Sequence, residues 1–239
     1  MSWLAELRGD TAEAFASLQA SAPASLPDEL SERHGRLGSA SATMRTEAWR
    51  GPVLAWARCA RLDAPPRSRV LSVLTLPDPS YDLPMFGAEI VEIGGTVTVV
   101  AIDWIPVAPD GRHLAPLADV RERHRDLPEG GELPAWAAAW FSPHAIFSRP
   151  AGTVSIDGIV HAYRDALGAY VGTCRDAEPA GDPVATWEAQ RRYCDAHRRD
   201  DPGSAMLARA FGAAWSERYA EDVLFPVARP PNGDGWSSS

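Results

Sequence analysis

One acidic residue, Glu89, lies in an apolar stretch that has the pattern of a β-hairpin. Strands are expected at residues 86–93 and 96–105, because β-branched residues fill both runs and a pair of glycines joins them. Side chains alternate between the two faces of a strand, so Glu89 shares an apolar face with Val91. A carboxyl group buried there without a partner has a raised pKa. A neutral acid can donate a proton, so we expect Glu89 to be a general acid.

The basic residues exclude several kinds of chemistry. All 23 are arginines, because the sequence contains no lysine. Enzymes that form a Schiff base through lysine, including pyridoxal phosphate enzymes, are therefore excluded, and so is a Walker A phosphate loop. The net charge of -9 argues against a nucleic-acid partner, which normally meets a basic surface.

The cysteines and the hydropathy indicate a cytoplasmic protein. Cys59, Cys174 and Cys194 are far apart and form no Cys-x-x-Cys pair, so no metal site is expected. The three thiols are expected to be reduced. No apolar run approaches the ~20 residues of a membrane helix. The N-terminal residues lack the pattern of a secretory signal. We therefore expect no membrane partner.

The rest of the chain must supply the elements that position these residues. Further strands are expected at 52–62, 69–76 and 141–150, and helices at 2–19, 116–125, 136–140, 155–174, 183–199 and 202–225. Residues 20–46 are rich in Ser, Ala and Pro and are predicted to be an irregular arm, and residues 229–239 a disordered tail.

This order of elements predicts a single α/β domain over residues 1–228. Consecutive strands joined by tight turns are antiparallel, and helices must cover the faces of their sheet. No GxGxxG motif follows a strand, so a Rossmann dinucleotide site is not expected.

Three segments together resemble the ferredoxin-dependent bilin reductases, the enzymes that reduce biliverdin to phytobilins. The first is YDLPMFGAEIV at residues 81–91, and the second is FSPHAIFSRP at residues 141–150. The third runs from Tyr193 through Asp201-Pro202 to Phe225. Their order and spacing look like those of the family across roughly residues 50–226.

The resemblance implies a three-layer α–β–α sandwich with a central antiparallel sheet. The bilin would lie between the sheet and the C-terminal helices. No metal or flavin cofactor is implied: electrons would come singly from reduced ferredoxin, and protons from side chains and water, through bilin radicals. The expected partners are therefore ferredoxin and biliverdin IXα or a related linear tetrapyrrole, and we expect a monomer.

The resemblance also implies roles for single residues. Glu89 stands where most members have the aspartate that protonates the pyrrole nitrogens, and Asp201 matches a second proton donor. Arg149 matches an arginine that pairs with a bilin propionate, which a planar guanidinium can bind at two points.

Weaker assignments concern the edge of the pocket. Thr98 would lie near the other propionate, and Asp200 would face the substrate at the pocket edge. The family's propionate-binding lysine is replaced by Pro202, so Arg199 or Arg198 would take its place.

Ser72 is the clearest departure from the family. Some members have histidine there, hydrogen-bonded to the aspartate and the lactam oxygen, and others have asparagine. Serine can hydrogen-bond a substrate but cannot donate a proton near neutral pH. A two-electron reduction is therefore expected, rather than the four-electron reduction that needs the histidine.

Each assignment has an alternative. Glu89 would pair with a nearby arginine, Asp201 would only cap a helix, and Arg149 would only end a strand. The whole protein would be a bilin carrier without catalysis, or a reductase of red chlorophyll catabolite, which also looks to use glutamate at this place.

Ferredoxin is acidic, so docking on this net-negative chain requires a local basic face. The densest candidate cluster is Arg191, Arg192, Arg198 and Arg199, and the second is Arg121, Arg123 and Arg125.

Overall fold

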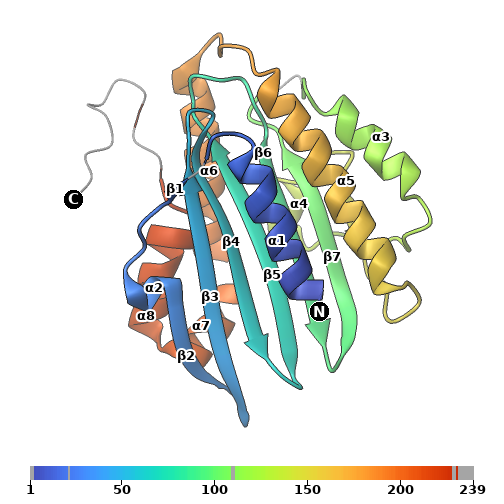
Figure 1. The fold of residues 1–239 in the computed structure, drawn as a ribbon, viewed down its shortest axis with the longest axis vertical. Helices are drawn as coiled ribbons and strands as arrows, with labels where there is room; N and C mark the ends of the chain where they lie inside the picture. The colour runs from blue at the N-terminus through green and yellow to red at the C-terminus, as the bar shows by residue number, and fades with distance from the viewer. Residues whose placement is uncertain (1–2, 21, 109–110, 228–229, 231–239) are drawn as a thin grey trace.

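An eight-stranded antiparallel sheet forms the middle layer of the molecule (Figure 1). The fold is a computed structural model that describes residues 3–20, 22–108, 111–227 and 230. The strands lie in the order β1-β3-β4-β5-β6-β7-β8, and β2 pairs with β3. Their bounds are β1 Ala22–Pro23, β2 Glu32–Leu37, β3 Ala40–Arg50, β4 Leu54–Ala64, β5 Ser68–Pro77, β6 Met85–Ile93, β7 Thr96–Ile105 and β8 Ile146–Ser148.

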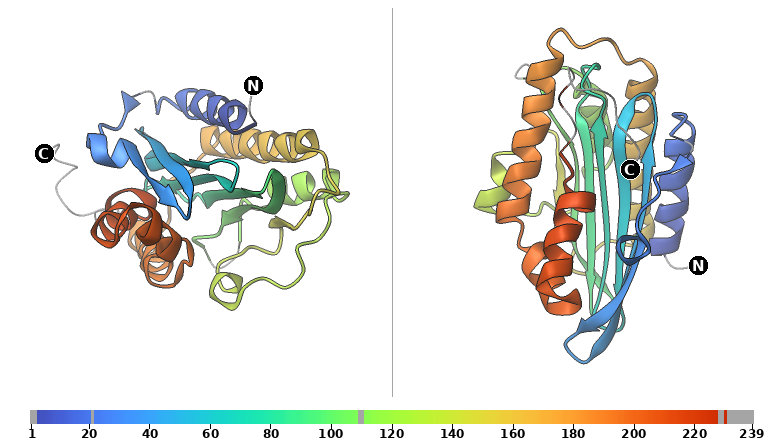
Figure 2. Two further views of the ribbon diagram at one scale, coloured as in Figure 1. Left: turned by 90° about the horizontal axis from the view of Figure 1, so that it is seen from below. Right: turned by 90° about the vertical axis from the view of Figure 1, so that its left-hand side faces the viewer.

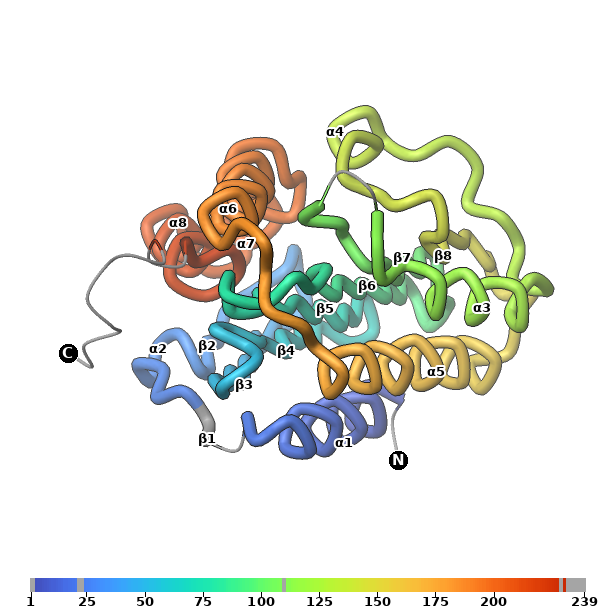
Figure 3. The backbone as a smooth tube through the Cα atoms, turned by 90° about the horizontal axis from the view of Figure 1, so that it is seen from above, coloured from blue at the N-terminus to red at the C-terminus, as the bar shows by residue number. Residues whose placement is uncertain are grey.

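Helices cover both faces of the sheet, which confirms the expected α–β–α sandwich (Figures 2 and 3). One face carries α1 Trp3–Ala16, α3 Ala115–Arg123 and α5 Ile156–Arg175. The other carries α4 Ala135–Ala138, α6 Pro183–Asp200, α7 Gly203–Phe211, α8 Ala213–Tyr219 and the π-helical turn η1 Ala220–Leu224. The short α2, Asp28–Ser31, lies beside β2 and β3.

Buried apolar side chains fill the space between the sheet and α5. Phe86, Ala88 and Ile90 of β6 are buried beneath α5, where the Phe86 ring contacts Tyr170 at a centroid distance of 5.4 Å. The Tyr170 hydroxyl lies 2.8 Å from Thr75 Oγ1 on β5. Because alternate side chains point to opposite faces, the residues between these buried ones face α6 instead.

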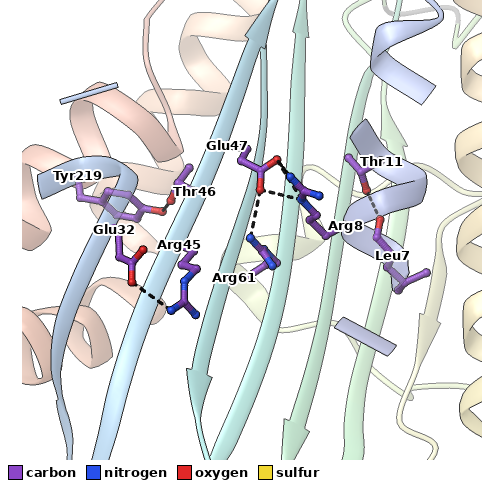
Figure 4. A network of polar contacts seen from close by, with 9 residues as sticks. All are labelled: Leu7, Arg8, Thr11, Glu32, Arg45, Thr46, Glu47, Arg61 and Tyr219. Atoms are coloured by element: carbon purple, nitrogen blue, oxygen red, sulfur yellow. Dashed lines mark hydrogen bonds and ion pairs between the residues drawn. The ribbon is translucent and has the colours of Figure 1, made fainter. Parts of the chain in front are cut away.

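Helix α1 is fixed to the sheet by an ion-pair network (Figure 4). Glu47 of β3 accepts hydrogen bonds from Arg8 of α1 at 2.7 Å and from Arg61 of β4 at 3.1 Å. These residues are partly buried on the face opposite α6, so the network attaches α1 to the sheet on the side away from the C-terminal helices.

The prediction of an irregular arm at residues 20–46 is wrong. This segment contains β1, α2, β2 and the first half of β3. Small and polar residues weakened the strand pattern, and tertiary packing overrides it. Gly35 of β2 lies so close to α7 that a Cβ atom there would be 2.2 Å from the Ala210 carbonyl oxygen.

Other predicted elements differ in length. The last helix, expected at residues 202–225, breaks at Gly212, whose φ of 99° favours glycine. The strand expected at 141–150 is reduced to Ile146–Ser148. The tail at 229–239 lies outside the described residues except for Pro230, so its disorder stays a prediction. The described part of the chain contains no helix with the length and apolar character to cross a membrane.

Candidate active site

A cavity lies between the sheet and the helices of the α6 layer. It encloses about 1060 Å³, counting the part open to solvent. Strands β4 to β7 form its floor, and α6, the segment around α4 and the residues after η1 form its walls. Rings line these walls: Trp136, Trp140, Phe141, Phe147, Tyr193, His197 and Phe225. Such a space suits a large, flat, conjugated ligand.

Four polar side chains cross the floor of this cavity, one from each strand. They are Arg58 on β4, Ser72 on β5, Glu89 on β6 and Asp103 on β7. Ser72 is the register partner of Glu89, and Gly87 is the partner of Asp103. The register therefore brings these residues together, although they are up to 45 positions apart in the chain.

The strand position of Glu89 predicted burial in an apolar core, but its side chain opens into the cavity instead. Its side chain is exposed, and no described residue forms a hydrogen bond or ion pair with it. The surrounding protein still removes much of its solvent, and this desolvation raises the pKa of Glu89 to about 7. The charge of Asp201 raises that pKa further, and Arg58 lowers it. The alternative of an arginine pair is therefore wrong among the described residues.

Asp201 reaches the cavity from the turn between α6 and α7. Its Oδ1 accepts a hydrogen bond from the backbone N–H of Gly203, the first residue of α7, at 2.7 Å. The carboxylate is half-buried and lies close enough to influence Glu89 electrostatically. Asp201 therefore accepts a hydrogen bond at the start of α7 and also lines the cavity.

Arg149 lies at the cavity rim, one residue after β8. Its guanidinium is exposed and stacks over the Phe147 ring at 5.0 Å. No acidic residue in the described part of the chain pairs with it. The group is therefore available to a carboxylate on a ligand.

Three predicted site residues lie outside the cavity lining. Thr98 donates a hydrogen bond to the Val91 carbonyl oxygen at 3.3 Å, beside a bulge in the pairing of β6 and β7. Arg199 and Asp200 form an exposed ion pair with each other at 2.7 Å. The structure therefore gives no support to a substrate contact by these residues.

Arg58, which is 3% exposed, was not among the site residues expected from the sequence. Its Nε donates to the Leu224 carbonyl oxygen at 3.0 Å, and its Nη1 donates to the carbonyl oxygen and Oγ of Ser72. Desolvation lowers the pKa of this arginine. The signal was present, because Arg58 shares a strand face with Trp56 and Ala60 just as Glu89 shares one with Val91.

Asp103 and His197 were also missed. Asp103 accepts hydrogen bonds from the backbone N–H and the hydroxyl of Ser142, and desolvation raises its pKa to about 6. The Nδ1 atom of His197 lies 2.9 Å from the Tyr193 carbonyl oxygen, which can only accept, so this nitrogen carries the proton. Burial lowers the pKa of His197, which favours the neutral imidazole. For His197 the signal in the sequence was its spacing of four residues from Tyr193 on α6 and from Asp201 just after that helix.

Most arginines of the two expected docking clusters are neutralised. In the first cluster Arg191 and Arg198 both lie within ion-pair distance of Asp195, and Arg199 pairs with Asp200. In the second, Arg123 pairs with Asp165 at 3.2 Å, and Arg125 with Glu122 at 2.7 Å. Neither cluster therefore presents the full positive charge that its sequence indicated.

The described residues that most often bind metals are not clustered, and the cysteine thiols are not ionised. Within residues 3–20, 22–108, 111–227 and 230, no three His, Cys, Asp or Glu residues are grouped to hold a metal ion. The three cysteines are buried, and desolvation raises the pKa of each to about 12, so they stay protonated thiols.

Comparisons with known proteins agree with this geometry. Residues 9–226 match the family model described as ferredoxin-dependent bilin reductase. The chain is 30% identical over 218 residues to phycoerythrobilin:ferredoxin oxidoreductase of Gloeobacter violaceus, covering 87% of this chain and 89% of the relative. It is 28% identical to 15,16-dihydrobiliverdin:ferredoxin oxidoreductase of the same organism, covering 87% of each. Tomato phytochromobilin synthase, solved in complex with biliverdin, shares the fold with a TM-score of 0.76 at 19% identity, over 92% of this chain and 82% of that one.

Proposed function

The chain belongs to the family of ferredoxin-dependent bilin reductases, and we propose that it reduces biliverdin IXα or a related linear tetrapyrrole to a phytobilin. Reduced ferredoxin supplies the electrons. One observation carries this proposal: an acid without a protein partner, Glu89, faces the cavity with a pKa of about 7. Such a group is partly protonated at neutral pH and can give its proton to a bound molecule.

The shape and polarity of the cavity support a bilin ligand. The aromatic walls offer stacking surfaces for a conjugated system, and the charged groups lie on the floor, at the rim and, for Asp201, in the wall. Arg149 at the exposed rim binds one propionate through its guanidinium, as a charge-assisted pair. The pyrrole nitrogens then lie over the floor, within reach of Glu89.

The reaction adds two electrons and two protons to the bilin. Each electron comes from one ferredoxin, and the first gives a bilin radical. Glu89 donates a proton to this radical, and Asp201 from the opposite wall donates the second. Ser72 hydrogen-bonds the substrate but does not supply a proton, which agrees with a two-electron reduction.

The experiment is an anaerobic absorbance time course. Purified protein is mixed with biliverdin IXα or, in parallel, with 15,16-dihydrobiliverdin, because a relative is named for the latter. Reduced ferredoxin is then added. Conversion of a bound long-wavelength band into a blue-shifted product supports the proposal, and chromatography identifies the bilin. A bound band that does not change indicates a carrier. Absence of a band for both compounds contradicts a biliverdin-type substrate and makes red chlorophyll catabolite the next compound to test.

A further inference from the structure

Arg58 is a buried cation that the structure leaves without a counterion. Its side chain rises from β4 into the floor of the cavity and is 3% exposed. No carboxylate in the described part of the chain lies within ion-pair distance of it. A buried charge without a partner is costly, and such charges are usually compensated by hydrogen bonds or by a ligand.

The hydrogen bonds of Arg58 use only some of the N–H donors of its guanidinium. Arginine has five N–H groups. The Nε group donates to the Leu224 carbonyl oxygen, and the two Nη1 groups serve the carbonyl oxygen and Oγ of Ser72. Nothing among the described residues accepts a hydrogen bond from Nη2, and this atom is not fully buried. Two N–H groups are therefore free to donate to a molecule in the cavity.

The neighbouring strands place an acid beside this donor. Arg58 pairs with Leu74 and lies diagonally next to Ser72, which is opposite Glu89. Arg58 and Glu89 act on each other electrostatically but do not form an ion pair. The three bonds hold Arg58 against Ser72 and Leu224, so a ligand oxygen can approach Nη2 while Glu89 stays free.

We propose that Arg58 contacts the substrate, donating from Nη2 to an end-ring carbonyl oxygen of the linear tetrapyrrole and stabilising the negative charge that each added electron brings. This inference rests on the proposed function, because it requires a reducible tetrapyrrole in the cavity. The end-ring carbonyl is the oxygen best suited to the enclosed floor, whereas the propionates carry full charges and suit the exposed Arg149.

The electrons and protons of this step balance without any change in Arg58. One electron passes from reduced ferredoxin to the conjugated system, and part of the resulting negative charge lies on the carbonyl oxygen. The guanidinium stays protonated and breaks no bond. A proton from Glu89 then neutralises the bilin. Fixed donors aimed at developing charge lower a barrier without reorganisation.

The test compares Arg58→Gln and Arg58→Lys with Arg61→Gln as a matched control. Arg61 is on the same strand but on the opposite face, where it pairs with Glu47 (Figure 4). Measurements are the affinity for biliverdin IXα, the carbonyl stretching frequency of the bound bilin, and the rate of its first one-electron reduction. Arg58→Gln should weaken binding about tenfold, raise the carbonyl frequency and slow the first reduction at least about tenfold. Arg58→Lys, which keeps the charge, should recover part of the rate.

The outcomes separate this inference from the proposed function. If the wild-type protein neither binds nor reduces the bilin, the proposed function fails. If the wild-type protein reduces it and a folded Arg58→Gln protein has the same carbonyl frequency and the same first rate, Arg58 has no such role. Should both Arg58 variants fail to fold, a crystal structure of the wild-type protein with biliverdin decides. Separation of Nη2 from every bilin oxygen by more than about 3.5 Å would overturn the inference.

Discussion

Ser72 and Glu89 are directly opposite each other in the pairing of β5 with β6, and both side chains face the cavity. The hydroxyl of Ser72 is already engaged by Arg58 Nη1 at 3.0 Å, whereas the Glu89 carboxyl has no partner among the described residues. Arg58 therefore fixes the position of the Ser72 oxygen and leaves only its O–H to donate to a ligand, whereas both oxygens of Glu89 are left for the ligand. This division determines which changes should affect binding and which should affect proton transfer.

The first prediction concerns the pH dependence of the reaction. Glu89 must be protonated to donate, and desolvation raises its pKa to about 7. The apparent kcat/KM for bilin reduction should therefore be highest below that value and fall as the pH rises through it, approaching a tenfold loss per pH unit. Steady-state rates from about pH 6 to pH 9, with saturating reduced ferredoxin, provide the measurement. A flat profile over this range would contradict an acid at Glu89.

The second prediction concerns removal of the acid. Glu89→Gln keeps the size of the side chain but cannot donate a proton, so the protein should bind bilin and stall at the radical or at the substrate. We expect the rate of product formation to fall about 10²- to 10⁴-fold, the scale of general acid catalysis. Stopped-flow absorbance and electron paramagnetic resonance follow the radical.

Asp200→Asn is the matched control for this substitution. It makes the same change of carboxyl to amide at an exposed residue outside the cavity lining. It should leave the rate of product formation close to that of the wild type. Full turnover by Glu89→Gln would remove Glu89 as the proton donor.

The site residues that the sequence could predict are those whose patterns are local. Glu89 stands out because a carboxyl group interrupts an apolar strand, and the order of strands and helices led to the correct layers. Thr98 could not be placed, because the bulge after Val91 pairs Glu92 with Val97 and leaves Thr98 without a register partner. A single-residue bulge of this kind changes which face a side chain takes.

Long-range packing accounts for the other errors. The β2–β3 hairpin depends on the contact of Gly35 with Ala210 of α7, 175 residues away in sequence. The grouping of Arg58 with Leu224 likewise depends on the position of the C-terminal segment over the sheet. Neither contact has a signature in the local order of residues, so both required the folded structure.

The third prediction concerns the rim arginine. Arg149→Ala removes a guanidinium that pairs with no acid among the described residues. The substitution should therefore weaken ligand binding and leave the stability of the fold unchanged. Loss of a charged hydrogen bond to a propionate should weaken bilin affinity by about 1–3 kcal/mol. Titration of biliverdin IXα by absorbance measures this change. Arg125→Ala, at an exposed residue of the second arginine cluster, serves as the control. Unchanged affinity in Arg149→Ala would place the propionate elsewhere.

The fourth prediction concerns Asp103, which connects β7 to Ser142 near the cavity wall. Its pKa in the folded protein is raised to about 6 from an ordinary value of 3.8, mainly by desolvation. A raised pKa means that the folded state holds this proton more tightly than the unfolded state. The contribution of Asp103 to stability is therefore fully present below about pH 4 and is lost as the pH rises through about 6.

Asp103→Asn removes this titration. The free energy of unfolding of the wild type, relative to Asp103→Asn, should fall by up to ~3 kcal/mol between about pH 4 and pH 7. Urea denaturation of both proteins at each pH measures the difference. The same substitution at the exposed Asp126 corrects for the general effect of losing one carboxyl group. If the difference between wild type and Asp103→Asn stayed constant across this range, Asp103 would titrate at the same pH in the folded and unfolded protein, and its desolvation beside Ser142 would not control its charge.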